Sequence, residues 1–374
     1  MNKKVRNPSL DVLRIIAFFL VVSLHFMTLS EYDKLATGGR MMLIMSIIRS
    51  VAIGCVPIFI MLTGYLQTNK TLSPKFYAGI IRPAVTYVLA GAACLVFKIV
   101  RYDYSKNILH NLLRILDFSA SDYGWYMEMF FGLFLMIPFL NAAYHGMKTR
   151  KAKTVLVITF MVLTALPGIL NTFNFLTEGW WSTPSLDRNY NKLIPGWWAG
   201  FYPVTYYFIG SYLREFPLKL KKSVNLLLLV LSAVVSGCYF YYRLKESPFF
   251  YGAFLTNASL FVLIPAVLLF SLVAERDMRS LPSPVRKILS TVSGWTLAAY
   301  LVSQTFDVVF YVKLKEAIPV IEHRMRYAPV MVLAVFSASL ILGGIIDTLF
   351  RLGDGAVKFI INKARNKSER NDIQ

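Results

Sequence analysis

Charged residues are scarce in this chain of 374 residues: they make up 16% of it, whereas hydrophobic residues make up 56%. So few charges cannot cover the surface of a water-soluble protein of this length. Apolar runs of about 20 residues recur instead, which is the length that spans ~30 Å of hydrocarbon. The sequence therefore predicts an all-α fold, a polytopic helical bundle in a membrane.

Acidic residues are half as numerous as basic ones, with 20 Asp and Glu against 40 Lys and Arg. Such an excess of positive charge can indicate a nucleic-acid-binding protein. Here the basic residues lie in short segments between apolar runs, and no nucleic-acid-binding motif accompanies them. The excess is more typical of charge that sets membrane topology, so no nucleic-acid partner is predicted.

Cysteine is also rare: Cys55, Cys94 and Cys238 each lie within an apolar stretch. They form no Cys-x-x-Cys or Cys/His pattern, which excludes a recognisable disulfide framework and a zinc site. We expect small core residues at these positions and no metal ion.

Ten apolar segments have the length of membrane spans, and the first is too long and too charged for a cleaved signal peptide. With the N-terminus in the cytoplasm, most Lys and Arg fall in inner segments, so both termini are predicted to be cytoplasmic. We predict one membrane domain, residues 1–350, and a basic, disordered tail, residues 351–374. The spans cover residues 10–29, 51–68, 83–101, 123–144, 154–172, 198–213, 224–242, 250–273, 288–311 and 329–350.

Three segments outside these spans have patterns of their own. Residues 102–122 carry apolar side chains at helical spacing, which predicts a helix on the membrane surface. A short interfacial helix is also expected from Arg40 to the start of the second span. Residues 173–197 are rich in aromatic and polar side chains. This composition suits either an interfacial aromatic belt or a platform for carbohydrate, and both interpretations stay open.

The first apolar segment contains three polar residues, Asp11, Arg14 and His25. Eleven residue steps separate Arg14 from His25, which is roughly 16 Å along a helix and leaves both on one face. Because a charge facing lipid costs several kcal/mol, this face must line protein or water. An anchoring ion pair and a buried structural imidazole would satisfy that condition, but so would a general base, since histidine titrates near neutrality.

Several motifs in order resemble a known family. They are Arg-x10-His within LDVLRIIAFFLVVSLH, followed by VPIFIMLTGYL (56–66), WYMEMFFGLFLMIPFLN (125–141), YPVTYYFIGSYL (202–213) and LAAYLVSQTFD (297–307). Together they resemble the integral-membrane acyltransferases of family three, in the branch found with Gram-positive surface polysaccharides. The resemblance extends over roughly residues 8 to 350.

This resemblance implies an enzyme, an acyltransferase that transfers groups other than amino-acyl groups. The implied donor is cytoplasmic acetyl-CoA, a co-substrate and not a permanently bound cofactor. The implied acceptor is a hydroxyl of a cell-surface or lipid-linked glycan. A multi-pass protein of the bacterial plasma membrane is expected, with membrane lipid and polysaccharide-assembly proteins as further partners.

The resemblance also implies roles for individual residues. His25 would act as a base or carry the acyl group covalently, Arg14 would stabilise or orient the donor, and Asp11 would hold Arg14. Glu128 interrupts an apolar run and is expected to fix the His25 tautomer or bind sugar hydroxyls. Donor-binding candidates are Arg82, Lys75 and Arg49; acceptor-binding candidates are Trp125, Tyr126, Glu178, Trp180, Trp181 and Asp307.

The sequence departs from the family pattern at two places. The family often has an Arg-x-x-Arg pair after its second helix, and here Gly79 stands where the first Arg would fall, with Arg82 at the second. A late Tyr-Leu is often followed by histidine, and here Ser303 occupies that position. Lys75 and Arg82 also suit ordinary topology-setting charge, and Arg49 and Asp307 suit charges at helix ends.

Two other functions fit the composition. A transporter or flippase for a lipid-linked glycan or an anionic solute would use the same polar path. It would be expected to show repeat symmetry or paired broken helices, and neither pattern is found. A structural partner in polysaccharide assembly would not need a catalytic His25.

Overall fold

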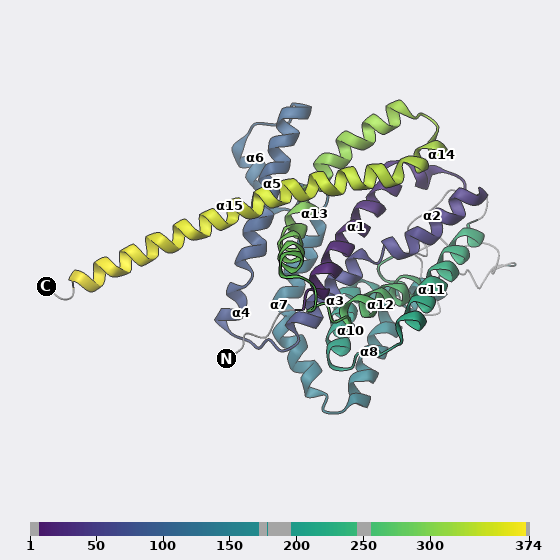
Figure 1. Cartoon of the computed structure of the whole chain (residues 1–374), viewed down its shortest axis with the longest axis horizontal. Coiled ribbons are helices and arrows are strands. Elements are labelled where there is room, and N and C mark those ends of the chain that lie inside the picture. The colour runs from purple at the N-terminus through teal and green to yellow at the C-terminus, as the bar shows by residue number, and fades with distance from the viewer. Residues whose placement is uncertain (1–6, 172–177, 179–195, 245–255, 372–374) are drawn as a thin grey trace.

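The computed structural model describes residues 7–171, 178, 196–244 and 256–371. Within these ranges the chain forms helices and no strands, which confirms the all-α prediction. The helices gather into one bundle, and α15 extends from it toward the C-terminus (Figure 1).

Eight segments of the described chain are long and apolar enough to cross a membrane. Three of them join two successive helices across a short break, and a fourth joins α14 to α15 through a 3₁₀ turn. The helices that build them are α1 (Ser9–Leu29), α2 (Gly39–Ala52) with α3 (Cys55–Gln67), α4 (Pro74–Ala78) with α5 (Ile81–Tyr102), α7 (Trp125–Gly146), α8 (Arg150–Thr164) with α9 (Pro167–Leu170), α11 (Lys222–Arg243), α13 (Ser283–Ala317), and α14 (Ile321–Arg324) with α15 (Ala328–Asn371).

The two other predicted spans form shorter helices, so the count of ten is not confirmed. Predicted span 198–213 overlaps α10 (Tyr202–Glu215), which has 14 residues, and span 250–273 overlaps α12 (Leu260–Ala274), which has 15. At 1.5 Å per residue these helices are roughly 21 and 22 Å long, less than the hydrocarbon thickness. The cytoplasmic placement of both termini stays a prediction from charge.

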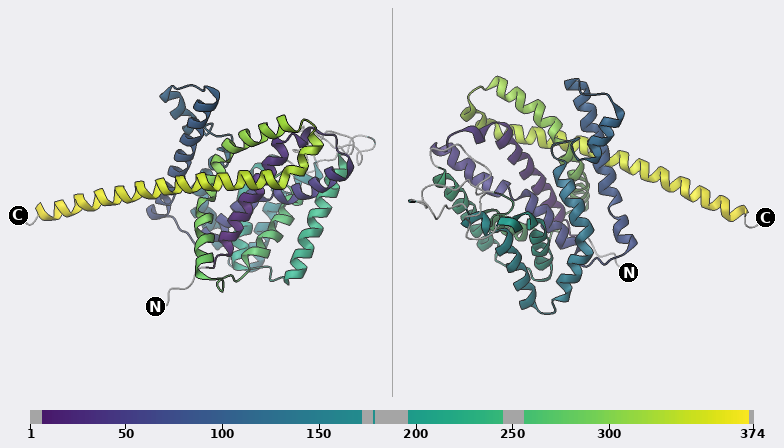
Figure 2. Two further views of the ribbon diagram at one scale, coloured as in Figure 1. Left: turned by 45° about the horizontal axis from the view of Figure 1, so that its top comes forward. Right: turned by 180° about the vertical axis from the view of Figure 1, so that it is seen from behind.

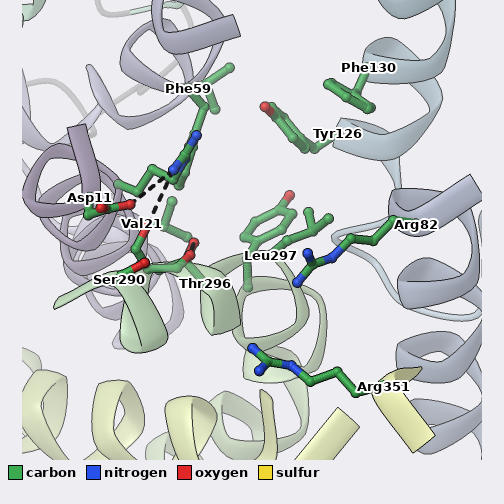
Figure 3. A pocket seen from close by; sticks show the side chains of 15 residues that line it. Asp11, Val21, Phe59, Arg82, Tyr126, Phe130, Ser290, Thr296, Leu297 and Arg351 are labelled. Atoms are coloured by element: carbon green, nitrogen blue, oxygen red, sulfur yellow. Dashed lines mark hydrogen bonds and ion pairs between the residues drawn. The ribbon is translucent and has the colours of Figure 1, made fainter. Parts of the chain in front are cut away.

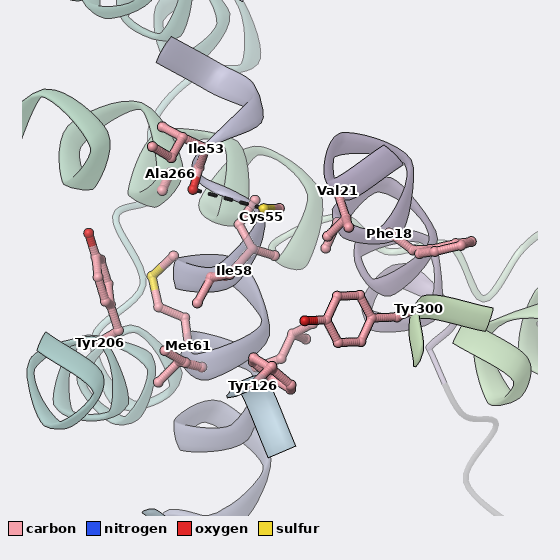
Figure 4. Packing of buried hydrophobic residues seen from close by; sticks show 14 of the residues in the cluster. Phe18, Val21, Ile53, Cys55, Ile58, Met61, Tyr126, Tyr206, Ala266 and Tyr300 are labelled. Atoms are coloured by element: carbon pink, nitrogen blue, oxygen red, sulfur yellow. Dashed lines mark hydrogen bonds between the residues drawn. The ribbon is translucent and has the colours of Figure 1, made fainter. Parts of the chain in front are cut away.

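Helix α1 lies inside the bundle and packs mainly against α13, α3 and α15. Leu13, Ala17, Phe18 and Val22 are completely buried along it. Figure 4 shows Phe18 and Val21 of this helix beside the ring of Tyr300. Because protein surrounds α1 on most sides, its polar residues face other helices, as the cost of charge in lipid requires.

Two glycines allow α3 and α10 to pack with their backbones in contact. A Cβ atom on Gly64 would overlap the Tyr207 carbonyl oxygen, and one on Gly210 would overlap the Met61 carbonyl oxygen. Small residues commonly permit such close approach between membrane helices. The two contacts are reciprocal: at each glycine, the backbone of the other helix occupies the space that a Cβ atom would need.

The cysteines match the expectation of core residues: Cys55 and Cys94 are buried, Cys238 is half-buried, and all three are free thiols. The predicted surface helix is α6 (Ile108–Leu116), whose side chains Ile108 and Leu109 are 77% and 67% exposed. Its placement on a membrane surface stays a prediction.

Two segments continue directly into the helices next to them. The expected interfacial helix from Arg40 is α2, which leads through Ile53 and Gly54 into α3 and buries Arg49. At the C-terminus the helix runs past residue 350, the predicted end of the membrane domain, and the disordered tail of residues 351–374 stays a prediction. Helix α15 continues to Asn371 and projects beyond the bundle (Figure 2), and no proline follows Pro329 to interrupt it.

Candidate active site

A cavity of about 520 Å³ opens beside the N-terminal half of α1 (Figure 3). Six helices contribute its walls, and the wall combines guanidinium groups, hydroxyl groups and aromatic rings. The lining residues are Asp11, Arg14, Val21, Val56, Phe59, Arg82, Tyr126, Phe130, Ser290, Ser293, Gly294, Thr296, Leu297, Tyr300 and Arg351. We call this space the Arg14 cavity.

Arg14 lies at one wall of the cavity and is held by two side chains. Its Nη1 atom is 3.3 Å from Asp11 Oδ1 and donates to Ser293 Oγ at 3.4 Å. Asp11 is almost fully buried, whereas the Arg14 side chain is 28% exposed. The expected Asp11–Arg14 contact is therefore present, and it leaves part of the guanidinium facing the cavity.

Two further guanidinium groups, those of Arg82 and Arg351, lie at the opposite wall. Both guanidinium groups contact the carboxylate of Asp347 on α15. Arg82 Nη2 donates to Oδ1 at 2.9 Å. Arg351 Nε donates to Oδ2 at 2.8 Å, and Arg351 Nη2 lies 2.7 Å from the same oxygen. The sequence pointed to Arg82 but not to Asp347, which fell at the end of the last predicted span, or to Arg351, which fell at the expected start of the tail. Their spacing of four residues on a helix was the available signal.

His25 lies near the other end of α1 in a small polar cluster. Its Nδ1 atom is 3.4 Å from Asp307 Oδ2, and the Tyr123 hydroxyl donates to the same oxygen at 2.5 Å. The Tyr123 ring also stacks on the imidazole with 4.0 Å between centroids. Asp307 is completely buried, whereas the His25 side chain is 20% exposed.

This geometry suits a histidine that acts as a base. A carboxylate near Nδ1 favours a proton on that nitrogen, so Nε2 is the atom suited to accept a proton from a substrate. Asp307 therefore lies beside the imidazole, and its expected role in acceptor binding stays a prediction. Tyr123 was not singled out from the sequence, where nothing distinguishes it from the other aromatic residues of its segment.

Two tyrosine rings lie between the Arg14 cavity and the His25 cluster. Tyr300 lines the cavity, its ring stacks at 5.9 Å on that of Tyr123, and its hydroxyl donates to the Tyr123 carbonyl at 2.9 Å. Tyr126 packs edge-on against Tyr300 at 5.6 Å. His25 is not among the residues that line the cavity, so these rings separate the two regions.

Two residues of α7 that were singled out from the sequence face away from the cavity. Glu128 and Trp125 are both exposed and, being three residues apart, share one helix face. The adjacent face carries Tyr126 and Phe130, which line the cavity. Asp307 thus occupies the place beside His25 that the sequence suggested for Glu128.

The other predicted residues are dispersed. Lys75 is exposed on α4 and does not line the cavity, while Arg49 is buried in α2 and interacts electrostatically with Tyr32 and Asp33. Glu178 is exposed between α9 and the turn Gly196–Phe201. Trp180 and Trp181 lie outside the described residues. Among those residues, no group of three or more His, Cys, Asp or Glu side chains is arranged to hold a metal ion.

Comparison with known proteins identifies the family. The chain matches the family model described as an acyltransferase domain, the third acyltransferase type, over residues 7–346. No curated protein and no solved structure matches the chain significantly. The matched range includes the Arg14 cavity apart from Arg351, and the whole His25 cluster. Eight apolar helical segments in the described part of the chain indicate a multi-pass membrane protein. By the match over residues 7–346, the chain belongs to the acyltransferase 3 family.

Proposed function

We propose that this protein is a membrane O-acetyltransferase of the bacterial plasma membrane. It moves an acetyl group from cytoplasmic acetyl-CoA to a hydroxyl of a cell-surface or lipid-linked glycan. The observation that carries the proposal is the arrangement on α1, which presents Arg14 to a cavity and His25 to a buried carboxylate.

The Arg14 cavity is the proposed site of the donor. Its volume of about 520 Å³ lies within the usual range of small-molecule sites. Arg14 and Arg82 offer guanidinium groups, which bind phosphate oxygens well. In this proposal the nucleotide end of acetyl-CoA stays near Arg82, and its pantetheine arm passes Arg14 toward His25.

The His25 cluster is the proposed site of proton transfer. His25 Nε2 takes the proton of the glycan hydroxyl as the oxygen forms a bond to the thioester carbon. Collapse of the tetrahedral adduct breaks the carbon–sulfur bond, and the imidazolium returns the proton to the leaving thiolate. Asp307 stabilises the imidazolium, and a base of this kind contributes ~10²–10⁴-fold. A two-step route through an acetylated Nε2 would use the same residues.

Transfer of the acetyl group from the Arg14 cavity to His25 requires movement of two tyrosine side chains. Tyr126 and Tyr300 separate the cavity from His25, so an acetyl group travelling between them requires these side chains to shift. The glycan acceptor and the association with polysaccharide-assembly proteins rest on the family resemblance. The exposed Trp125, two residues after Tyr123 in the chain, offers an aromatic face for a sugar ring.

The test is the O-acetyl content of surface glycans from cells that lack this protein. The cells are complemented with wild type, His25→Ala or His110→Ala at matched membrane abundance. His110 is an exposed histidine on α6 and serves as the control. We expect wild type and His110→Ala to restore O-acetyl groups and His25→Ala to fail, with glycan export normal throughout. Failure of export itself, corrected by His25→Ala, would favour a transporter and contradict the proposal.

A further inference from the structure

Arg82 and Arg351 share a single carboxylate at the wall of the Arg14 cavity. They come from α5 and α15, which are far apart in sequence, and both contact Asp347. One arginine would be enough to pair with this carboxylate. The second leaves the group with a net positive charge beside a space that a ligand can enter.

The exposure of the three side chains is unequal. Asp347 is 8% exposed, whereas Arg82 and Arg351 are 57% and 61% exposed. The carboxylate is therefore withdrawn into the protein while most of each guanidinium faces outward. Figure 3 shows Arg82 and Arg351 pointing into the cavity from the side opposite Asp11. An anion entering the cavity would meet donors before it met the carboxylate.

Two guanidinium forks fixed side by side are suited to a phosphate group. Each fork can give two parallel hydrogen bonds to phosphate oxygens, which is stronger and more directional than a lysine contact. Asp347 holds both side chains in place, which lowers the entropy lost when they bind. Arg82 also lies in the first turn of α5, where the helix dipole favours negative charge.

We propose that Arg82 and Arg351 together bind a phosphate or diphosphate group of the ligand, with Asp347 as their positioning residue. The identity of the ligand, a nucleotide thioester, rests on the proposed function, whereas the anion site itself rests on the geometry. The C-terminal helix thereby becomes part of the donor site.

The test measures binding of two probes, CoA and inorganic diphosphate, to the full-length protein in lipid nanodiscs by calorimetry. Arg351→Ala is compared with Arg351→Lys and with Arg279→Ala. Arg279 is a suitable control because it too is half-exposed and paired with a nearby carboxylate, Asp277, but lies outside the cavity. We expect Arg351→Ala to weaken both probes about tenfold, since hydrogen bonds between charged groups are lost.

Arg351→Lys should show a smaller loss, because it keeps the charge but not the fork, and Arg279→Ala should bind as wild type. If Arg351→Ala bound CoA and diphosphate as tightly as the wild type, the anion site would be overturned, while acetyl-CoA would remain the proposed donor. Diphosphate binding that depends on Arg351, without any CoA binding, would retain the anion site and overturn the donor. Absence of diphosphate binding in the wild type would also overturn the anion site.

Discussion

The two ends of α1 offer opposite environments. Around Arg14 lies a cavity of about 520 Å³ with three guanidinium groups in its walls, two of them more than half exposed. Around His25 the side chains are in direct contact, and the carboxylate of Asp307 is completely buried. The first environment has room for a charged ligand, and the second fixes one imidazole. The difference suggests that binding and proton transfer are assigned to separate regions of one helix.

The largest effect is expected from His25→Ala, which should impair O-acetyl transfer without changing CoA binding. His25→Ala should lower the O-acetyl content formed per unit of membrane protein by ~10²–10⁴-fold, because the base is lost. The affinity for CoA, measured by calorimetry, should not change, since His25 does not line the cavity. Arg14→Ala should weaken CoA binding. Loss of CoA affinity in His25→Ala would show that the two regions act as one site.

The next effect concerns the carboxylate beside the imidazole. Asp307→Asn should reduce O-acetyl formation about 100-fold, because an amide stabilises the imidazolium poorly and favours no single tautomer. Asp117→Asn, at an exposed carboxylate that bonds to Ser119, is the control. Equal losses in the two variants would argue against a role for Asp307 at His25.

A third change should disturb both regions equally. Gly64→Ala places a methyl group where α10 has a carbonyl oxygen, so the helices must separate, at a cost of about 2 kcal/mol or more. The thermal midpoint of the purified protein should fall by several degrees, together with CoA binding and transfer. Gly132→Ala is the matched control because the added methyl group would have no atom within 4 Å apart from its chain neighbours and the nearby backbone of its own helix. A normal midpoint in Gly64→Ala would contradict the close contact of α3 and α10.

The smallest effect lies just beyond the His25 end of α1. Hydrogen bonds from Lys34 and Arg324 lower the pKa of Glu31 to about 2, against an ordinary value of 4.5. Because the folded pKa is depressed, the stabilisation is present above pH 4.5 and is lost as the pH falls toward 2. Acidification across this window should therefore lower the thermal midpoint more in wild type than in Glu31→Gln. The difference should be about 2 °C, and equal responses would contradict the contribution of Glu31.

Helical periodicity in the sequence was sufficient to predict contacts between residues of the same helix. Asp11 and Arg14 are three residues apart and do meet, and the apolar runs mark the long helices. Periodicity carries no information on which distant helix comes to lie opposite. Asp307 faces His25 from α13 and Arg351 faces Arg82 from α15, and both relations depend on packing between helices.

Other predictions were limited by the same missing information on how helices pack. Glu128 was a reasonable partner for His25 because it interrupts an apolar run, but the rotation of α7 directs it outward. Helices α10 and α12 are apolar but have only 14 and 15 residues, so the predicted count of ten spans is not confirmed, because hydropathy does not fix the length of a helix. The role of Tyr123 depends on a turn before α7 that no periodic pattern describes.

The reciprocal glycine contacts of α3 and α10 have a mechanical consequence. Two helices whose backbones interlock at Gly64 and Gly210 cannot slide past each other without first moving apart. They form a fixed frame, and α3 carries Val56 and Phe59 of the cavity wall on that frame. A passage between Arg14 and His25 can therefore open while the α3–α10 contact stays intact, by rotation of Tyr126 and Tyr300 or by displacement of α7 and α13 relative to this pair.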